Sequence, residues 1–236
     1  MSDAIEIKNL VKRYKEVLAL DHFNLQVKEG EIFGLLGPNG SGKTTAINCI
    51  LSLLQYDKGE IKVFGKEMLP DSYESKRNIG VVMQNVAVFE ELSVYENVDY
   101  FCGLYIKDKK IRKQYVEEAI SFVGLEEYVK FLPKKLSGGL LRRLNIACGI
   151  AHKPKLIFFD EPTKGIDVGA KYEIYVLMNE MTKQGKSIVM ISSDMEEILG
   201  VSDRILVLCE GEVGGELTKD KFSQENVLKL ASGMKL

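Results

Sequence analysis

The sequence contains no long hydrophobic run. None of the uninterrupted apolar stretches in its 236 residues approaches the ~20 residues that a membrane-spanning helix needs. The opening "MSDAIEIKNLVKRYK" carries charges where a signal peptide would have its apolar core. We therefore expect the chain itself to stay in the cytosol.

Cysteine and histidine are scarce. The chain has only two histidines, and its four cysteines lie far apart without forming a C-x-x-C pair. Zinc sites and redox-active pairs depend on close spacings of these residues. We interpret the cysteines as reduced thiols of the core rather than as a metal site. They are Cys49, Cys102, Cys148 and Cys209.

An excess of charge of one sign is also missing. Charged residues make up 28% of the chain and the formal net charge is -2, so no global basic field is available to neutralise many phosphates. We therefore expect no nucleic-acid partner. Hydrophobic residues at 45% indicate a globular chain with one compact core and a subdomain, or with two small domains.

The order of the apolar segments predicts an α/β fold. Alternation in "IEIKNL" and "FNLQV" indicates antiparallel strands with one solvated face. From Glu31 onward, short apolar strands such as "EIFGLLG", "KLIFFD" and "SIVMIS" alternate with helical segments, which is typical of a parallel sheet wrapped by helices. Towards the end, a hairpin-like "GEVGGEL" precedes a last helix.

The middle of the chain has a different pattern. Between Phe89 and Ala151 no convincing strand occurs, and apolar residues recur at helical spacing. We interpret residues 89–151 as a helical subdomain inserted into a core formed by residues 1–88 and 152–236. The alternative is a set of ordinary core helices without separate identity.

A phosphate-binding motif follows the strand "EIFGLLG". The segment "GPNGSGKT" fits G-x-x-x-x-G-K-[ST] and opens a predicted helix, so its backbone N–H groups can converge on a phosphate. Lys43 is expected to reach the β- and γ-phosphates and the Thr44 hydroxyl to ligate Mg²⁺. The alternative is a glycine-rich turn with a solvated lysine. The expected nucleotide contacts are Gly37, Asn39, Gly40, Ser41, Gly42, Lys43, Thr44 and Thr45.

Two carboxylates end another predicted strand. In "LIFFDE", four apolar residues place Asp160 and Glu161 at the carboxyl end of the strand, where ligands bind in parallel sheets. Asp160 is expected to hold Mg²⁺ through water, and Glu161 to orient or deprotonate the attacking water. On its own the pair is weak support, because acids often cap the next helix. The phosphate loop makes it a predicted catalytic site.

A third motif, "KLSGGLLRRL", opens a predicted helix with Ser137, Gly138 and Gly139, which suits a second anion and equally suits an ordinary N-cap. Three other residues occur with it in a fixed order: Tyr14 after "LVKR", Gln84 after "IGVVM" and Asp167 in "EPTKGID". Together these motifs resemble the ATPase subunit of ATP-binding cassette (ABC) transporters over essentially the whole chain. The resemblance implies a P-loop NTPase with a mainly parallel central sheet, an antiparallel edge subdomain and an inserted helical subdomain.

The resemblance also implies that two cassettes dimerise head to tail. Each ATP then lies between the phosphate loop of one cassette and the serine-glycine-glycine signature of the other. Tyr14 would stack on adenine and Gln84 would sense Mg²⁺ and water, while Ser137 and Gly139 would touch the γ-phosphate bound by the partner. The alternatives are a strand-edge aromatic for Tyr14 and a turn residue for Gln84. The implied ligands are ATP and Mg²⁺, with Thr44, Gln84 and Asp160 at the metal.

Four positions depart from the family pattern. Leu140, Arg142 and Lys164 replace a usual glutamine, a frequent polar amide and a frequent serine, and we interpret these changes as tolerable variations. The fourth position, Asp194, replaces a histidine that in the family contacts the γ-phosphate. Asp194 is therefore a candidate catalytic residue.

Asp194 cannot simply replace that histidine. An ionised carboxylate donates no hydrogen bond, and about 4 Å from a phosphate charge it is repelled by roughly 4 kcal/mol at an effective dielectric of 20. One alternative is that Asp194, or Ser193 with Glu196, caps the helix that follows and stands away from the phosphate. The other is that neighbouring charges keep Asp194 protonated, so that it donates the hydrogen bond itself.

The chain resembles two branches of the family at once. From Ile5 to about Pro162 the chain resembles the ATPases of drug, lipid or polysaccharide exporters. From "GIDVGAKYEIY" onward it resembles the second cassette of bacterial monosaccharide importers, in which an acid also occupies the histidine position. The resemblance implies an intermediate lineage, or a chain that was assembled from two parents or designed.

The expected function is an ATPase that powers transport by separate membrane-spanning chains. The expected partners are a second cassette, identical or different, and integral permease subunits that hold the chain at the inner face of the cell membrane. An alternative is a module that dimerises on ATP but hydrolyses little, because Asp194 weakens the site. A soluble cassette of the translation or DNA-repair kind fits less well, since no second cassette, long charged linker or coiled coil is visible.

Overall fold

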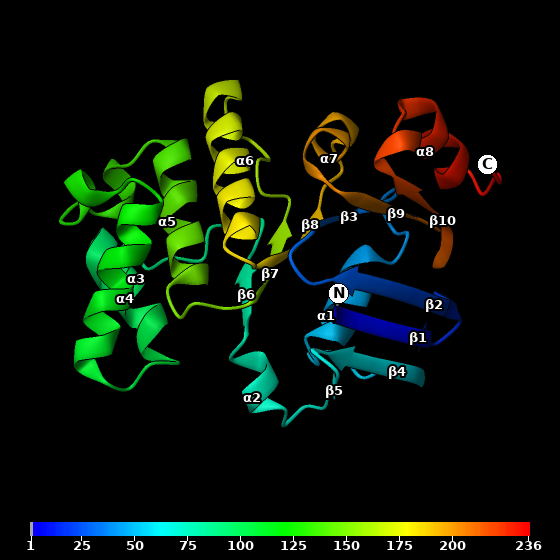
Figure 1. Cartoon of the computed structure of the whole chain (residues 1–236), viewed down its shortest axis with the longest axis horizontal. Helices are drawn as coiled ribbons and strands as arrows, with labels where there is room; N and C mark the ends of the chain where they lie inside the picture. The colour runs from blue at the N-terminus through cyan, green and yellow to red at the C-terminus, as the bar shows by residue number, and fades with distance from the viewer. Residues whose placement is uncertain (1) are drawn as a thin grey trace. The chain divides into compact units, whose positions relative to one another are not determined.

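The computed structural model describes residues 2–236 and divides into two compact units. The terminal unit comprises Met1–Lys76 and Ser187–Leu236, and the central unit comprises Arg77–Lys186. In Figure 1 the terminal unit contains the blue and the orange-to-red segments, and the central unit contains the green and yellow helices. Because the terminal unit is built from both ends of the chain, one of its sheets pairs strands that are far apart in the sequence.

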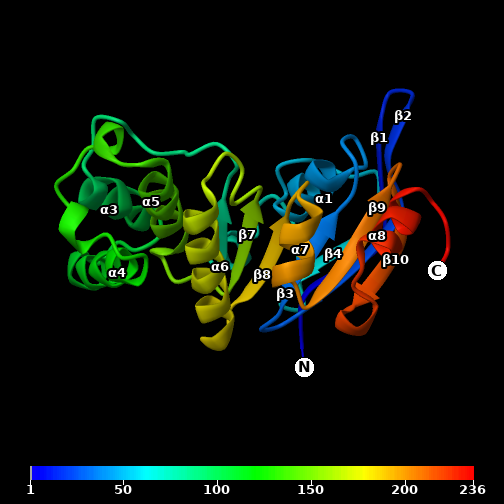
Figure 2. The same ribbon diagram turned by 90° about the horizontal axis from the view of Figure 1, so that it is seen from above.

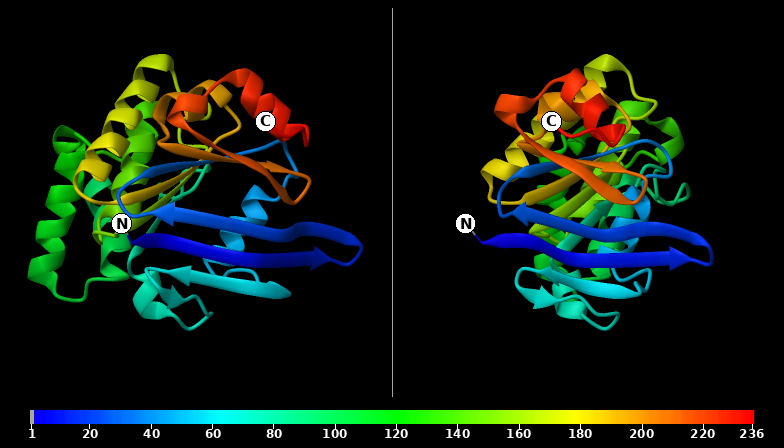
Figure 3. Two further views of the ribbon diagram at one scale, coloured as in Figure 1. Left: turned by 45° about the vertical axis from the view of Figure 1, so that its right-hand side comes forward. Right: turned by 90° about the vertical axis from the view of Figure 1, so that its right-hand side faces the viewer.

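The first sheet of the terminal unit is antiparallel, with the strand order β2-β1-β4-β5. β1 and β2 form the long blue hairpin of Figure 3, in which Ile7 lies opposite Leu25. Phe23, Leu25 and Val27 are buried while the residues between them are exposed, which is the pattern of a sheet with one solvated face. The strands are β1 (Asp3–Tyr14), β2 (Val17–Lys28), β4 (Lys58–Val63) and β5 (Lys66–Glu67).

The terminal unit also contains four strands of mainly parallel pairing. β3 lies between β8 and β9 and is parallel to both, and β10 pairs antiparallel with β9. Every residue of β3 and β8 is buried, as expected for continuous apolar strands that are covered on both faces. The strands are β3 (Ile32–Leu36), β8 (Ser187–Ile191), β9 (Arg204–Cys209) and β10 (Glu212–Thr218). The helices are α1 (Lys43–Ile50), α2 (Tyr73–Lys76), α7 (Met195–Val201), α8 (Gln224–Ala231) and the short η3 (Lys219–Lys221).

The central unit is mostly helical. It contains one parallel strand pair, β6 with β7, and no strand between residues 89 and 151. Ser93 and Glu96 form a capping box at the start of α3, and Asp108 caps α4. Figure 2 shows α3, α4 and α5 packed side by side. The elements are β6 (Ile79–Val82), α3 (Val94–Gly103), α4 (Lys109–Phe122), η1 (Glu126–Tyr128), η2 (Pro133–Lys135), α5 (Gly138–Ile150), β7 (Leu156–Asp160) and α6 (Val168–Lys183).

These elements confirm the predicted α/β class, with parallel strands, an antiparallel sheet and a helical region. The division into a core of residues 1–88 and 152–236 and a subdomain of residues 89–151 stays a prediction. The compact units of the structure have their boundaries after Lys76 and after Lys186. Among residues 2–236, no helix is long and apolar enough to cross a membrane.

The cysteines lie mainly in the core. Cys49, Cys102 and Cys148 are buried, and Cys209 is partly exposed. Burial raises the pKa of Cys49 and of Cys102 to about 11, and it also raises the pKa of Cys148. Such thiols stay protonated at neutral pH and therefore react slowly. The prediction of core thiols is confirmed for these three residues.

Candidate functional site

The predicted phosphate loop joins β3 to α1 in the terminal unit. Gly40 and Gly42 have φ of 80° and 104°, in the left-handed region. A Cβ atom at Gly42 would lie 2.7 Å from the carbonyl oxygen of Ala19. Both the backbone conformation and the available space therefore require glycine immediately before the helix.

The N-terminus of α1 has the features of an anion site. Within the described chain no side chain caps this helix, so its first N–H groups are open to a ligand. The hydroxyl of Ser41 is buried and has no hydrogen-bond partner among residues 2–236. Buried polar atoms are rarely left without a partner. A phosphate on this loop would satisfy both groups.

Lys43 lies over the same loop. Its Nζ donates to the carbonyl oxygens of Gly37 at 2.7 Å and Pro38 at 3.0 Å, and the residue is 9% exposed. The alternative of a plain turn with a solvated lysine is therefore wrong. The loop residues fit a triphosphate, because they offer backbone donors, a hydroxyl and an ammonium at one place.

Tyr14 ends β1 and is 44% exposed. The ammonium of Lys12 lies 5.2 Å from the centre of its ring, within the range of a cation–π contact. The exposed aromatic side chain is compatible with stacking on a base and with a plain strand-edge role. Adenine binding by Tyr14 stays a prediction.

Asp194 is the N-cap of α7. Its Oδ1 accepts hydrogen bonds from the backbone N–H groups of Glu196 at 3.1 Å and Glu197 at 3.2 Å. Ser192 supports this turn, because its hydroxyl donates to the buried carboxylate of Glu197 at 2.5 Å and accepts from the N–H of Asp194 at 3.0 Å. The helix-capping part of this alternative is thus confirmed for Asp194. A contact of this residue with phosphate stays a prediction.

In the central unit, β7 carries the two predicted carboxylates. Asp160 is the last residue of the strand, and Glu161 follows it with a φ of 47°. A residue other than glycine in this left-handed region costs on the order of 1 kcal/mol or more, and it persists only where its surroundings hold it. The carbonyl oxygen of Glu161 is indeed held, by Arg142.

Arg142 of α5 is the central side chain of this region. It is only 3% exposed, and its guanidinium donates to five backbone carbonyl oxygens. One side chain therefore ties the residues after β6 to the residues after β7. The acceptors are Met83 at 2.6 Å and Gln84 at 3.1 Å on one side, and Asp160 at 3.3 Å, Glu161 at 2.9 Å and Pro162 at 2.6 Å on the other.

This role of Arg142 was not predicted from the sequence, where the residue is interpreted as a tolerable variation. A signal was present in "LLRRLNI", where two arginines interrupt an apolar helix. Arg143 is partly exposed and pairs with Glu173 and the carbonyl oxygen of Val123. Arg142 instead shares the buried face with Asn145, which also donates to Met83, at 3.2 Å. A buried arginine needs several acceptors, and this need predicts a cluster of carbonyl groups around it.

Replacing Arg142 with methionine should lower the free energy of unfolding by about 3 kcal/mol or more, because buried carbonyl groups lose a charged donor. Arg142→Lys should recover only part of the loss, since one ammonium cannot serve both sides of the planar guanidinium. The matched control is Arg143→Met, which removes a partly exposed ion pair and one hydrogen bond, to the carbonyl oxygen of Val123, and should cost about 1–2 kcal/mol. Urea unfolding measures all three variants. Equal losses for Arg142→Met and Arg143→Met would contradict the assignment.

The predicted signature residues begin α5. Ser137 is the N-cap and accepts from the N–H of Leu140 at 3.3 Å, so the capping role is present. A Cβ atom at Gly139 would lie 2.8 Å from Ala170, whereas a Cβ atom at Gly138 would meet nothing within 4 Å in the described chain. Packing therefore explains Gly139 but not Gly138. A glycine at an exposed helix start is favourable where another molecule approaches the backbone closely.

The predicted site residues are divided between the two units. The terminal unit contains Tyr14, the phosphate loop and Asp194, and its loop residues Asn39 and Thr44 are exposed. The central unit contains the signature, the two carboxylates and Gln84, whose side chain is exposed. Within the central unit, Arg142 brings together the backbone of Gln84 and that of the carboxylate pair.

Comparison with known proteins shows one family. The ABC transporter family profile matches residues 20–164. The ribose import ATP-binding protein RbsA of Bacillus cereus is 34% identical over 97% of this chain and 47% of that protein. The chain thus spans about half the length of the curated relatives it matches.

Two solved structures extend the comparison to the fold. CbiO1 from Clostridium perfringens, part of the ABC transporter complex CbiONQ, gives a TM-score of 0.88 at 26% identity, over 97% of this chain and 94% of that one. The dimeric structure of a post-hydrolysis state of the ATP-binding cassette MJ0796, bound to ADP and Pi, gives a TM-score of 0.81 at 30% identity. That match covers 92% of this chain and all of the other.

Proposed function

Because the chain belongs to the ABC transporter family as an ATP-binding cassette, we propose that it binds and hydrolyses ATP to power transport by separate membrane-spanning subunits. The observation that carries this proposal is the phosphate loop, with its open helix N-terminus, its buried Ser41 hydroxyl and the Lys43 ammonium. On ATP binding, Lys43 exchanges its carbonyl partners for oxygens of the two terminal phosphates. Charge-assisted hydrogen bonds of this kind are about twice as strong as neutral ones.

We assign Mg²⁺ to the hydroxyl of Thr44, the carboxylate of Asp160 and the amide of Gln84. Sites that hold Mg²⁺ with a nucleotide use one or two carboxylates together with phosphate oxygens and water. They need no cluster of three acidic or histidine ligands, and residues 2–236 contain no such cluster. When bound, the ion neutralises charge on the β- and γ-phosphate oxygens.

Glu161 acts as the general base of the reaction. A water oxygen attacks the γ-phosphorus while the Glu161 carboxylate takes the water proton, and the bond from that phosphorus to the bridging oxygen breaks. The electron pair leaves with ADP, and the proton passes to the phosphate or to solvent. Because Arg142 holds the carbonyl oxygen of Glu161, the carboxylate starts from a fixed backbone position.

The cassette works as a dimer, identical or mixed, on separate permease subunits. Ser137, Gly138 and Gly139 face the nucleotide held by the partner cassette, and the exposed Gly138 lets the partner's phosphate approach the backbone. The MJ0796 cassette is dimeric in its solved structure, which supports this arrangement. The permease subunits would hold the cassette at the inner face of the cell membrane.

Phosphate release from purified protein tests the proposal. Saturable release that requires both ATP and Mg²⁺ is the expected result. A protein that binds ATP and dimerises but releases no phosphate would instead favour the second candidate function, an ATP-gated module without hydrolysis. The observation that favours this second candidate is Asp194, which caps α7 with an acceptor oxygen where the family has a donor.

Asp194→His should raise ATP turnover on the order of tenfold, because it adds a donor to the γ-phosphate in the transition state. Asp194→Asn is the matched control, because asparagine also caps helices. This variant keeps the helix cap and removes the negative charge. Turnover of the three proteins is compared over pH. Wild-type turnover that falls as pH rises, with no such fall for Asp194→Asn, would identify a protonated Asp194 as the donor. Three superimposable profiles would exclude Asp194 from the chemistry.

The origin of the chain from two branches of the family is also part of our proposal. Its support lies in the exporter-like signature helix and in the acid at position 194, which importer second cassettes share. Proteins named for ribose import match 97% of the chain, so importer likeness extends beyond the last third. Separate comparison of residues 5–162 and 163–236 with exporters and importers tests the idea, and the same preference in both halves would contradict it.

A further inference from the structure

We propose that the central unit contains a second binding site, for a small monocarboxylate with an apolar body. The site is a cavity of about 300 Å³ formed by α4, the end of α5 and the end of α6. This volume is at the lower end of the range for small-molecule sites, about 300–1,000 Å³. None of the residues assigned to ATP lines the cavity, so the inference does not rest on the proposed function.

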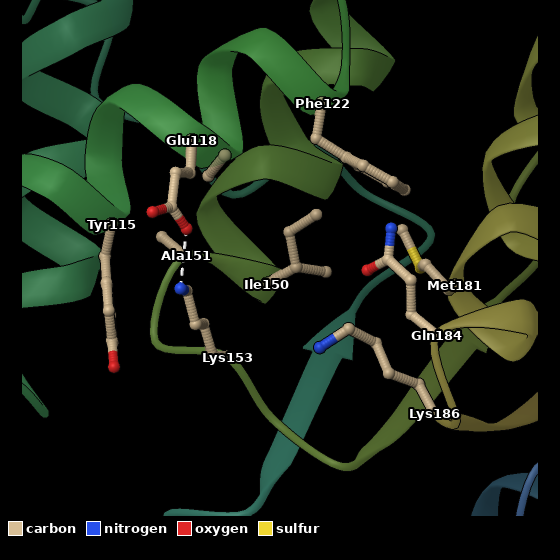
Figure 4. Close-up of a pocket in the computed structure, with 10 residues that line it drawn as sticks. Tyr115, Glu118, Phe122, Ile150, Ala151, Lys153, Met181, Gln184 and Lys186 are labelled. Carbon is tan, nitrogen blue, oxygen red and sulfur yellow. Dashed lines mark ion pairs between the residues drawn. The ribbon is translucent and has the colours of Figure 1, made fainter.

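One wall of the cavity is apolar. Ala119 and Phe122 come from α4, Ile150 from α5 and Met181 from α6. The last three are labelled in Figure 4. Met181 is fully buried in the core, and Ala119 and Ile150 are nearly so. Phe122 is only partly buried, so it supplies most of the hydrophobic surface that is open to the carbon body of a ligand.

Lys186 supplies the charge. Its Nζ donates to the carbonyl oxygen of Pro154 at 3.1 Å, and no carboxylate forms an ion pair with it within residues 2–236. The residue is partly buried, and this burial, followed by the charge of Lys153, lowers the pKa of Lys186. A partly desolvated ammonium without a counter-ion is unfavourable, and an anion in the cavity would relieve it.

The other charges of the cavity neutralise each other. Lys153 pairs with Glu118 at 2.5 Å, drawn as a dashed line in Figure 4, and lies 4.0 Å from the centre of the Tyr115 ring. The lining therefore has two positive side chains and one negative side chain, which leaves a single positive charge, on Lys186. One positive charge matches a monoanion. A phosphate dianion would bring a second negative charge towards Glu118 and the apolar wall.

Gln184 completes the recognition of a carboxylate. Figure 4 shows its amide and the Lys186 ammonium on the same side of the cavity, with the amide oxygen towards Ile150 and the amide nitrogen towards Phe122. A half-turn of this exposed amide brings its N–H₂ to the ammonium side, where it is a second donor for a two-oxygen group. An ammonium and an amide at one end with a hydrophobic wall at the other fit a compact aromatic or branched carboxylate.

The probe for the test is 4-fluorobenzoate, observed by fluorine NMR with the full chain and without nucleotide. We expect saturable broadening of its signal, at least tenfold weaker binding of the neutral 4-fluorobenzamide, and no competition by inorganic phosphate. No binding of 4-fluorobenzoate, or equal binding of the amide, would overturn the proposal. Competition by phosphate would overturn the monocarboxylate class.

Two substitutions locate the probe in this cavity. Lys186→Met keeps the length of the side chain but removes the charge, and it should weaken binding at least tenfold. Gln184→Glu, at an exposed position where folding is little affected, supplies Lys186 with a carboxylate and should weaken binding to a similar extent. The matched control is Lys155→Met, an exposed lysine that does not line the cavity. Unchanged binding in a folded Lys186→Met or Gln184→Glu variant, or an equal loss in Lys155→Met, would place the probe elsewhere.

Discussion

Replacing Glu161 with glutamine should lower ATP turnover by a factor of about 100 or more and leave ATP affinity nearly unchanged. Glutamine has almost the same shape but takes no proton from water, so only the general base is lost. The carbonyl oxygen at position 161 still accepts from Arg142, because the backbone is not altered. Phosphate release and calorimetry measure the two quantities. A variant with full turnover would assign the base to another group.

Glu161→Gln should also accumulate as an ATP-bound dimer, because the two cassettes still bind ATP and associate but do not hydrolyse it. Light scattering should then report twice the monomer mass of 26.5 kDa. Ser137→Arg in this background should abolish the dimer, since it places a large side chain against the partner's phosphate. Ser121→Arg is the matched control, an exposed serine on α4 that does not belong to the signature. A dimer that survives Ser137→Arg, or a protein that stays monomeric with ATP, would contradict the head-to-tail arrangement.

Lys43→Ala should weaken ATP binding by a factor of about 100, equivalent to roughly 3 kcal/mol. The lysine is expected to bond the two terminal phosphates as a compact charge, and backbone amides cannot supply that charge. The difference should be smaller for ADP, which lacks the γ-phosphate. Calorimetry with both nucleotides measures the effect.

The matched control for Lys43→Ala is Lys66→Ala. Lys66 belongs to the same unit, and its ion pair with Glu74 is exposed. Its removal should leave nucleotide affinity unchanged and stability nearly so. Unchanged ATP affinity in Lys43→Ala, with circular dichroism showing a folded protein, would contradict the assignment of the phosphate loop.

Much of the fold could be predicted because its signals are local. The strands β3 and β8 are continuous apolar runs, and β2 alternates, so that burial follows directly from the order of residues. The phosphate loop is predictable for a similar reason, because its motif "GPNGSGKT" is contiguous and stands between a strand and a helix.

The role of Arg142 could not be predicted in the same way. Its acceptors are backbone carbonyl groups 59, 58, 20, 19 and 18 residues away. Every residue has a carbonyl group, so the sequence contains no mark of which ones will converge. The proposed role of Lys186 could not be predicted from the sequence either, because the lack of a counter-ion is visible only once all neighbouring side chains are placed.

Asp194 shows where a local pattern was insufficient. Its sequence context allowed both a helix cap and a phosphate contact, since the two roles use the same carboxylate. The structure decides the first, through hydrogen bonds to residues two and three positions ahead. The phosphate contact depends on where a ligand binds, and the spacing of residues in the sequence does not give the distance from Asp194 to that ligand.

The five bonds of Arg142 have a consequence for how this chain can evolve. One guanidinium bonds carbonyl groups after both β6 and β7. If either loop shifts, Arg142 loses the acceptors of that loop, and the other loop has no further carbonyl groups to replace them. Insertions beside Gln84 and beside Pro162 should therefore be strongly epistatic, each harmful alone and tolerated only with a compensating change. The backbone position of the proposed base, Glu161, should therefore change in evolution only together with the loop of Gln84.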